Sequence, residues 1–281
     1  MKLKLTFVLY LLTALTLTSR AQLCAIDYKS DEFAQFRASK TYFIKSGNAK
    51  FDNAAMAALQ DSWKITPFAA IESSELKTKI TDKSASFIGL VLLGEMNHGY
   101  HYLALFNGGK KSIDRYQYDD MIAYAPTNHW VDENELTDCS WRVRNMLEGM
   151  IQAIDIVQKN DMKGSSLKLV NGLREYYNAK APIIKKRTLL ISETSMGGKF
   201  KPQDFQAAYP FKLEICKREK IEKAIADKST DYYYLQPGIT LNKSWMVVDP
   251  SNGEVVYFNY AMMGLNIRDK EIKEMVEFIQ K

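Results

Sequence analysis

One passage of the chain occurs twice, and this repetition constrains the fold more than any other feature. TPFAAIESSELKTKITDKS (residues 66–84) resembles YPFKLEICKREKIEKAIADKS (residues 209–229), and both passages end in the tripeptide DKS. Each contains two apolar residues four positions apart, which is the spacing of one apolar helix face. These residues are Leu76 and Ile80 in the first passage and Ile221 and Ile225 in the second. Both passages therefore predict a helix that leads into a strand.

The correspondence continues outward and predicts one order of elements in both halves. KTYFIKS (residues 40–46) precedes the first passage and RTLLIS (residues 187–192) precedes the second, each a short strand-like run. Helical patterns over residues 139–158 and 268–280 close the two halves. Each half is expected to form β-α-β-α-β-β-β-α. The expected fold class is α/β (α+β), a tandem duplication of this unit with helices packed on a mixed sheet.

The connections between strands predict the strand directions. The first three strands of each half are joined through helices, so they should be parallel. Tight turns are expected at Asn97–Gly99, Asn107–Gly109 and Ser251–Gly253, so the later strands should be antiparallel. The resulting segments are a signal peptide (1–21), an N-terminal lead (22–39), a first repeat (40–160), a bridging helix (161–185) and a second repeat (186–281).

The N-terminus has the pattern of an export signal. Lys2 and Lys4 precede an apolar run over residues 5–17, and cleavage is expected between Ala21 and Gln22. The run is too short and too rich in threonine to anchor the chain across a bilayer. This junction resembles those of exported proteins of Gram-negative Bacteroidota.

Removal of the signal makes the chain nearly neutral. The full sequence has 38 basic and 33 acidic residues, a formal net charge of +5. Residues 1–21 contain Lys2, Lys4 and Arg20 and no acidic residue, so 38 − 3 = 35 basic residues remain and the balance falls to +2. Nucleic acids and anionic membranes attract concentrated basic surfaces. Neither is expected as a partner.

Three cysteines remain after cleavage, namely Cys24, Cys139 and Cys216. Export permits a disulfide, but an odd count leaves at least one thiol without an intrachain partner, and the pairing stays open. A lipid anchor on Cys24 is disfavoured because Gln22 and Leu23, rather than small residues, precede it. Cys139 precedes a predicted helix, where Thr137 or Asp138 would serve as the cap, and this structural role is favoured over a catalytic thiolate.

The three histidines are the sharpest candidates for chemistry. His98 and His101 form HxxH, and with His129 and Glu95, Asp119 or Asp120 they would offer a metal site. HxxH binds metals best on a helix, whereas His98 is expected at a hairpin tip and His101 on a strand. No catalytic, cofactor-binding or metal residue is therefore assigned, and these histidines remain the alternative.

Two further patterns are interpreted as structural. SMGGKF (residues 195–200) and SGNAKF (residues 46–51) suggest phosphate-binding loops, but a strand-to-helix turn needs glycine whatever it binds. Clustered aromatic residues suggest a binding platform, although tyrosine is also favoured in strands for packing. The aromatic set comprises Tyr100, Tyr102, Tyr116, Tyr118, Tyr232, Tyr233, Tyr234, Tyr257, Phe258 and Tyr260.

The element order over residues 40–106 and 187–250 resembles the small α/β domain of the TolB N-terminal region and of CsgG-like envelope proteins. This resemblance implies an envelope protein that contacts other proteins, and it carries over no functional residue. We expect an exported, periplasmic or extracellular, non-enzymatic binding or assembly protein without a cofactor, whose partner is a protein or glycan of the cell envelope. The alternative is a hydrolase or metal-dependent enzyme with its site near His98, His101 and His129.

Overall fold

A computed structural model describes residues 30–95, 98–110, 112–116, 120–127, 139–164, 166–193, 202–239, 242–262 and 269–281. The first unit (residues 30–159) contains α2 (Ser30–Ala38), β1 (Lys40–Ile44), α3 (Ala49–Ser62), β2 (Phe68–Ile71), α4 (Ser73–Lys79), β3 (Ala85–Glu95), β4 (His98–Asn107), η1 (Ile113–Arg115), β5 (Met121–Pro126), η3 (Ser140–Arg142) and α6 (Val143–Lys159). Next comes α7 (Ser166–Asn178). The second unit (residues 181–280) contains η4 (Ala181–Lys186), β6 (Thr188–Ser192), α8 (Pro202–Ala208), β7 (Leu213–Cys216), α9 (Arg218–Ala226), β8 (Tyr232–Ile239), β9 (Asn242–Val248), β10 (Val255–Met262) and α10 (Asp269–Gln280).

The strands form two five-stranded mixed sheets with the same internal order. The first is β2-β1-β3-β4-β5, and the second, read in the matching direction, is β7-β6-β8-β9-β10. In each sheet the second strand of this order, β1 or β6, pairs parallel with both of its neighbours, and the remaining pairs are antiparallel. The predicted α/β fold class is confirmed, and the two similar units are compatible with duplication.

Two of the three predicted turns differ from expectation. β3 and β4 are joined by residues 96–97, not by a turn at Asn97–Gly99. Asn107–Gly109 does not close a hairpin, because β4 and β5 are separated by residues 108–120. The reason lies in close backbone packing. Gly109 N–H donates to the carbonyl of Ile80 at 2.7 Å, and a Cβ added to Gly108 would lie 2.1 Å from the backbone oxygen of Asp82, in the turn that follows α4.

The third turn was predicted correctly. Asp249 N–H donates to the carbonyl of Glu254 at 2.8 Å, which closes the β9–β10 hairpin over Ser251–Gly253. Gly253 has a φ of 68°, the left-handed region that glycine enters without steric cost.

The helix before the first strand of the first unit was not predicted, whereas η4, before the first strand of the second unit, overlaps the end of the predicted bridging helix (161–185). α2 precedes β1 and η4 precedes β6, and in each a carbonyl within the last turn accepts from the residue just before the strand. Ser39 N–H donates to Phe36 at 3.0 Å, and Arg187 N–H donates to Ile184 at 3.2 Å. Phe36 and Ile184 are fully buried. These turns therefore each place an apolar side chain in a core cluster, Phe36 between the sheets and Ile184 on the far side of the second sheet.

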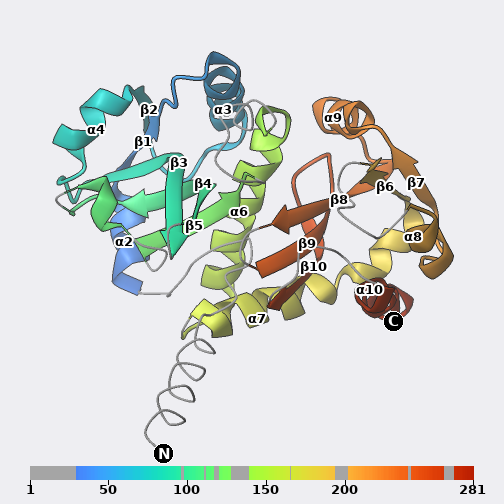
Figure 1. The fold of residues 1–281 in the computed structure, drawn as a ribbon. Coiled ribbons are helices and arrows are strands. Elements are labelled where there is room, and N and C mark those ends of the chain that lie inside the picture. Colours follow the sequence, from blue (N-terminus) through green and yellow to red (C-terminus); the bar gives the residue numbers. More distant parts are fainter. Residues whose placement is uncertain are drawn as a thin grey trace, which may run out of the picture.

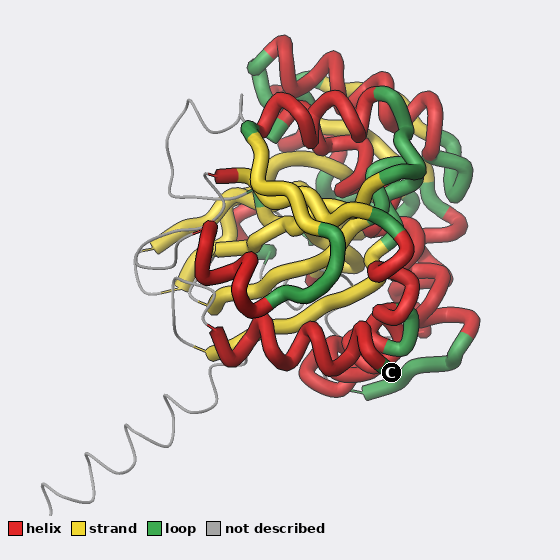
Figure 2. Tube along the Cα trace, turned by 90° about the vertical axis from the view of Figure 1, so that its right-hand side faces the viewer, coloured by secondary structure: helices red, strands yellow, loops and turns green. Residues whose placement is uncertain are grey.

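The first unit lies on the left and the second unit on the right in Figure 1, with α6 between their two sheets. The core between the sheets takes residues from α3 and α6 of the first unit, from α7, and from α9 of the second unit. The counterparts of α3 and α6, which are α8 and α10, contribute to the core on the far side of the second sheet. In the side view, helices flank the strands (Figure 2). The face that packs against α3 and α6 in the first sheet therefore points toward the second unit, whereas the equivalent face of the second sheet, which packs against α8 and α10, points away from the first unit.

The face of the first sheet that points away from the second unit is covered by segments of the first unit itself. Ile80 at the end of α4 and Tyr116 after η1 both join the apolar cluster on this face. Tyr116 also donates its hydroxyl to the carbonyl of Asn107 at 2.7 Å. The long β4–β5 connection thus covers apolar residues here, whereas α6 and α7 do so on the matching face of the second sheet.

Among the helices of the described ranges, none combines the length and the apolar character that crossing a bilayer requires.

Candidate functional site

His98 occupies a strand position rather than a turn. It is the first residue of β4 and pairs in register with Glu95 of β3. His101 lies three residues further along the same strand, as predicted. Positions three apart on a regular strand fall on opposite faces of a sheet. On this strand the two histidine positions therefore do not share one face, as HxxH would on a metal-binding helix.

His101 lies half-buried near the end of the first sheet, and the partial burial lowers the pKa of its imidazole, which favours the neutral form. Its carbonyl accepts hydrogen bonds from Thr127 N–H at 3.1 Å and from the Thr127 hydroxyl at 2.9 Å. His129 and Asp119 lie outside the described residues. Within the described part of the chain, no three His, Cys, Asp or Glu residues form a group that could hold a metal ion. The metal hypothesis stays a prediction.

The two described cysteines are buried and do not form a disulfide with each other. Cys139 and Cys216 are 1% and 7% exposed, and Cys24 lies outside the described residues. Burial, followed by the nearby Glu214 charge, raises the pKa of the Cys216 thiol. A raised pKa disfavours the thiolate that a nucleophile requires. Their described environment is that of small apolar core residues. The proposed helix caps, Thr137 and Asp138, lie outside the described residues.

Most of the aromatic set lies in the core. Tyr232 and Tyr234 face the core between the sheets, and Tyr233 faces the far side of the second sheet, as strand alternation predicts. Tyr100 (its side chain) and Tyr118 lie outside the described residues. The set members that are buried are Tyr102, Tyr116, Tyr233, Tyr234, Tyr257 and Phe258.

The first glycine turn binds its own helix. Gly47 has a φ of 85°, and its N–H donates to the Asp52 carboxylate at 3.1 Å. The same carboxylate accepts from Ser46 N–H at 2.8 Å, and Asn48 caps α3 by accepting from Phe51 N–H at 3.1 Å. These side chains occupy backbone donors that a phosphate would need, and they fix the start of α3. The second turn, residues 195–200, lies outside the described residues.

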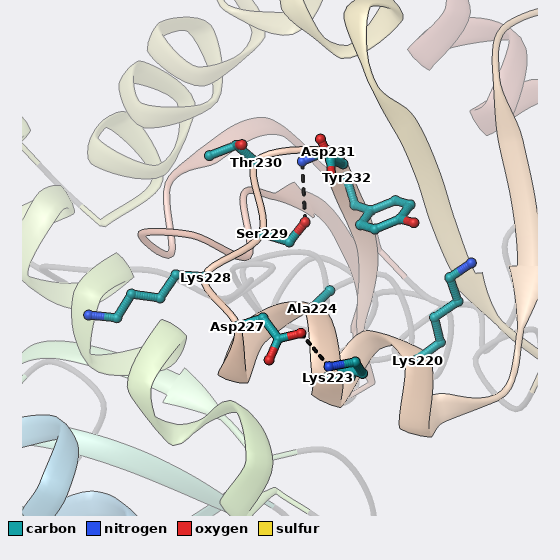
Figure 3. Close-up of a pocket in the computed structure, with 9 residues that line it drawn as sticks. All are labelled: Lys220, Lys223, Ala224, Asp227, Lys228, Ser229, Thr230, Asp231 and Tyr232. Atoms are coloured by element: carbon teal, nitrogen blue, oxygen red, sulfur yellow. Dashed lines mark hydrogen bonds and ion pairs between the residues drawn. The ribbon is translucent and has the colours of Figure 1, made fainter.

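A pocket of about 530 Å³ opens at the turn between α9 and β8 (Figure 3). It is formed by the end of α9, the second DKS tripeptide and the start of β8. Its lining carries one aromatic ring, three hydroxyls, three lysine side chains and two carboxylates, and the Lys228 side chain points away from the other lining side chains (Figure 3). The lining residues are Lys220, Lys223, Ala224, Asp227, Lys228, Ser229, Thr230, Asp231 and Tyr232.

Each ammonium group of the pocket has a carboxylate partner. Lys220 Nζ lies 2.5 Å from Glu214 Oε1 on β7, and it also lies 5.3 Å from the centre of the Tyr232 ring. The hydrogen bond to Glu214 raises the pKa of Lys220. Lys223 Nζ lies 2.6 Å from Asp227 Oδ2 within α9. Ion pairs as exposed as these contribute little to stability and exchange readily.

Lys228 connects the pocket to the first unit. Its Nζ lies 3.1 Å from Asp61 Oδ2, at the end of α3. Its φ is 50°, a left-handed conformation that glycine normally takes at a helix end. The end of α9 is fixed by hydrogen bonds from Lys228 N–H to the Ile225 carbonyl at 3.2 Å and from Ser229 N–H to the Ala224 carbonyl at 2.9 Å.

The two DKS tripeptides have different conformations. Asp82 accepts from Ser84 N–H at 2.8 Å and from the Ser84 hydroxyl at 2.7 Å. In the second tripeptide Ser229 instead accepts from Asp231 N–H at 3.3 Å. Within the described residues, positive φ values outside glycine occur at Asp161 and Lys228, so Lys83 does not share the conformation of Lys228. The repeated letters mark the same place in the fold but not the same geometry.

Beside the pocket, the seam between the units contains a buried carboxylate. Glu148 on α6 is 9% exposed and accepts from Arg144 at 2.8 Å and from the Ser62 hydroxyl at 3.0 Å. Burial raises the pKa of Glu148, and the Arg144 charge opposes that rise. Arg144 also lies 3.5 Å from Asp61, the partner of Lys228. The pocket and the seam therefore share one chain of charges.

The β9–β10 turn docks directly onto α6. The carbonyl of Asn252 accepts from Gln152 Nε2 at 2.8 Å. A Cβ added to Gly253 would lie 2.8 Å from the backbone oxygen of Asn145, so the approach requires glycine.

No protein-family model, curated protein or solved structure matches the chain.

Proposed function

We propose that the chain is an exported, non-enzymatic binding protein that holds a protein or glycan partner of the cell envelope in the pocket at the α9–β8 turn. The pocket itself carries this proposal. Its volume of about 530 Å³ falls within the range of ligand-binding pockets, roughly 300–1,000 Å³. Its donors and acceptors of both charges suit a ligand rich in polar groups.

The groups in the pocket favour binding over catalysis. A nucleophile needs an adjacent general base, and the pocket hydroxyl of Ser229 instead accepts a hydrogen bond from the backbone of Asp231. Tyr232 supplies a half-buried ring on the wall, a surface on which sugar and peptide groups can pack.

Arrays of glycans and of envelope-derived peptides, probed with the purified full chain, test the proposal. Tyr232→Ala should abolish binding to the retained partner. Tyr42→Ala is the matched control, because it removes a similar lysine-over-tyrosine contact, with Lys79 at 5.1 Å, from the first unit. Equal binding by the wild type and Tyr232→Ala would exclude this pocket as the site.

Export is part of the same proposal. N-terminal sequencing of the protein recovered from the cell envelope or the medium should begin at Gln22. A first residue of Met1 would exclude cleavage after Ala21.

A further inference from the structure

We propose that this pocket recognises an anionic group of its partner, a carboxylate, sulfate or phosphate, and that Lys228 is the cation that exchanges its internal partner for the ligand. The inference rests on the proposed function for the place of binding. It adds the chemical class of the ligand and the residue that detects it.

The three pocket lysines differ in how they are held. Lys220 pairs with Glu214 on the adjacent strand, and Lys223 pairs with Asp227 one helical turn away. Both pairs are local, and release of either lysine would strip the carboxylate of its described partner. Lys228 instead pairs across the seam with Asp61 of the first unit.

Asp61 can lose Lys228 without becoming isolated. Arg144 Nε lies 3.5 Å from the same carboxylate oxygen. The charges of Arg144 and Lys64, after the dominant contact with Lys228, also lower the pKa of Asp61. Because other cations remain beside Asp61, an anion in the pocket competes for Lys228 at low cost.

The backbone supports a functional role for this lysine. A left-handed conformation is unfavourable for lysine, and glycine would adopt it without strain. Lys83, at the same position of the first DKS tripeptide, has no positive φ. Of the two DKS tripeptides, the one with this conformation is therefore the one that lines the pocket, where the hydrogen bonds that end α9 hold Lys228 in place.

The test is a titration of the purified full chain with sodium acetate, sulfate and phosphate in separate arms at constant ionic strength. The backbone amide signals of residues 227–232 are followed by NMR. At least one anion should give saturable shifts there, and the tightest one identifies the group that the partner presents. Lys228→Gln should weaken that binding about tenfold or more, the size of a lost charge-assisted hydrogen bond.

Asp61→Asn should tighten the same binding by about two- to fivefold, because it frees Lys228 from an exposed ion pair. Lys83→Gln is the matched control and should leave the binding unchanged. Shifts that stay linear in all three arms would overturn the inference, as would unchanged binding by Lys228→Gln or weaker binding by Asp61→Asn. The array test with Tyr232→Ala does not depend on these titrations. A pocket that binds its partner without recognising an anion can therefore be distinguished from a pocket that does not bind the partner at all.

Discussion

Asn178 Oδ1 accepts a hydrogen bond from the backbone N–H of Phe258 at 2.9 Å. β10 is an edge strand of the second sheet, and α7 supplies this side-chain acceptor for its backbone. A comparable contact occurs at the edge of the first sheet. There the guanidinium of the buried Arg142 donates to the carbonyl of Pro126, the last residue of β5, at 3.3 Å. Buried polar side chains thus satisfy edge-strand backbone groups and reduce pairing with other chains.

Asn178→Ala should lower the free energy of unfolding by about 2 kcal/mol, because it leaves a buried backbone donor without its acceptor. Denaturation with urea measures the change. Asn171→Ala, also on α7, is the control. It removes the acceptor for the hydroxyl of Tyr260 at a half-buried position where water can replace it. Equal losses in the two variants would contradict the role of Asn178 at the edge.

Gly253→Ala should destabilise the protein by about 3 kcal/mol, since it combines an unfavourable positive φ with a clash at the seam. Gly47→Ala shares the positive φ, but its Cβ would meet no atom within 4 Å. This control should lose only about 1 kcal/mol in the same unfolding measurement. A similar loss for both variants would show that the close approach of Gly253 to α6 adds nothing to the cost of the positive φ.

Lys228→Gly should raise the free energy of unfolding by about 0.5–1 kcal/mol through relief of backbone strain. Lys83→Gly should have the opposite sign, because Lys83 gains no relief and the unfolded chain gains freedom. Thermal unfolding by circular dichroism compares the two. A loss of stability in Lys228→Gly would mean that its side-chain contacts outweigh the strain.

Glu148→Gln should change how stability depends on pH. Burial raises the pKa of Glu148 in the folded protein, so the protonated form is favoured by folding. Its contribution is complete below the unfolded pKa of about 4.3 and is lost as the pH rises through the raised folded value. The groups facing Glu148 are Arg144 on α6, Ser62 on α3, and Lys228 and Tyr234 of the second unit.

Unfolding free energies of the wild type and Glu148→Gln, measured from pH 3 to pH 8 (an experimental range chosen about that pKa), give the difference directly. The advantage of the wild type should be largest at the acidic end and should shrink as the pH rises. Glu277→Gln on α10 replaces an exposed glutamate and should not reproduce this trend. A wild-type advantage that grows with pH would contradict the sign.

The repeated passage predicted the order of elements and a mixed sheet, though not the strand order, because strand runs and helix faces leave periodic apolar residues in the sequence. Phe43 and Leu190 lie in strands of matching position and both are buried. The β4–β5 connection could not be predicted in this way. Gly108 and Gly109 indicate a hairpin by local rules, but their role is set by tertiary contacts with the end of α4.

The candidate site was harder to predict than the fold. The DKS tripeptide was evident as a landmark, but identical residues gave no sign that Lys228 alone takes a left-handed φ while Lys83 does not. The ion pair between Lys228 and Asp61 joins residues 167 positions apart and depends on how the units stack. The histidines attracted attention by residue type, yet strand spacing separates His98 from His101.

The shared apolar core means that neither half of the chain is self-sufficient. Phe51 of the first unit and Ile221 of the second belong to one buried cluster, so melting of either half exposes the apolar surface of the other. Unfolding should therefore proceed as a single cooperative transition, although no strand of one sheet is hydrogen-bonded to a strand of the other. Expressed alone, either fragment would be prone to aggregation.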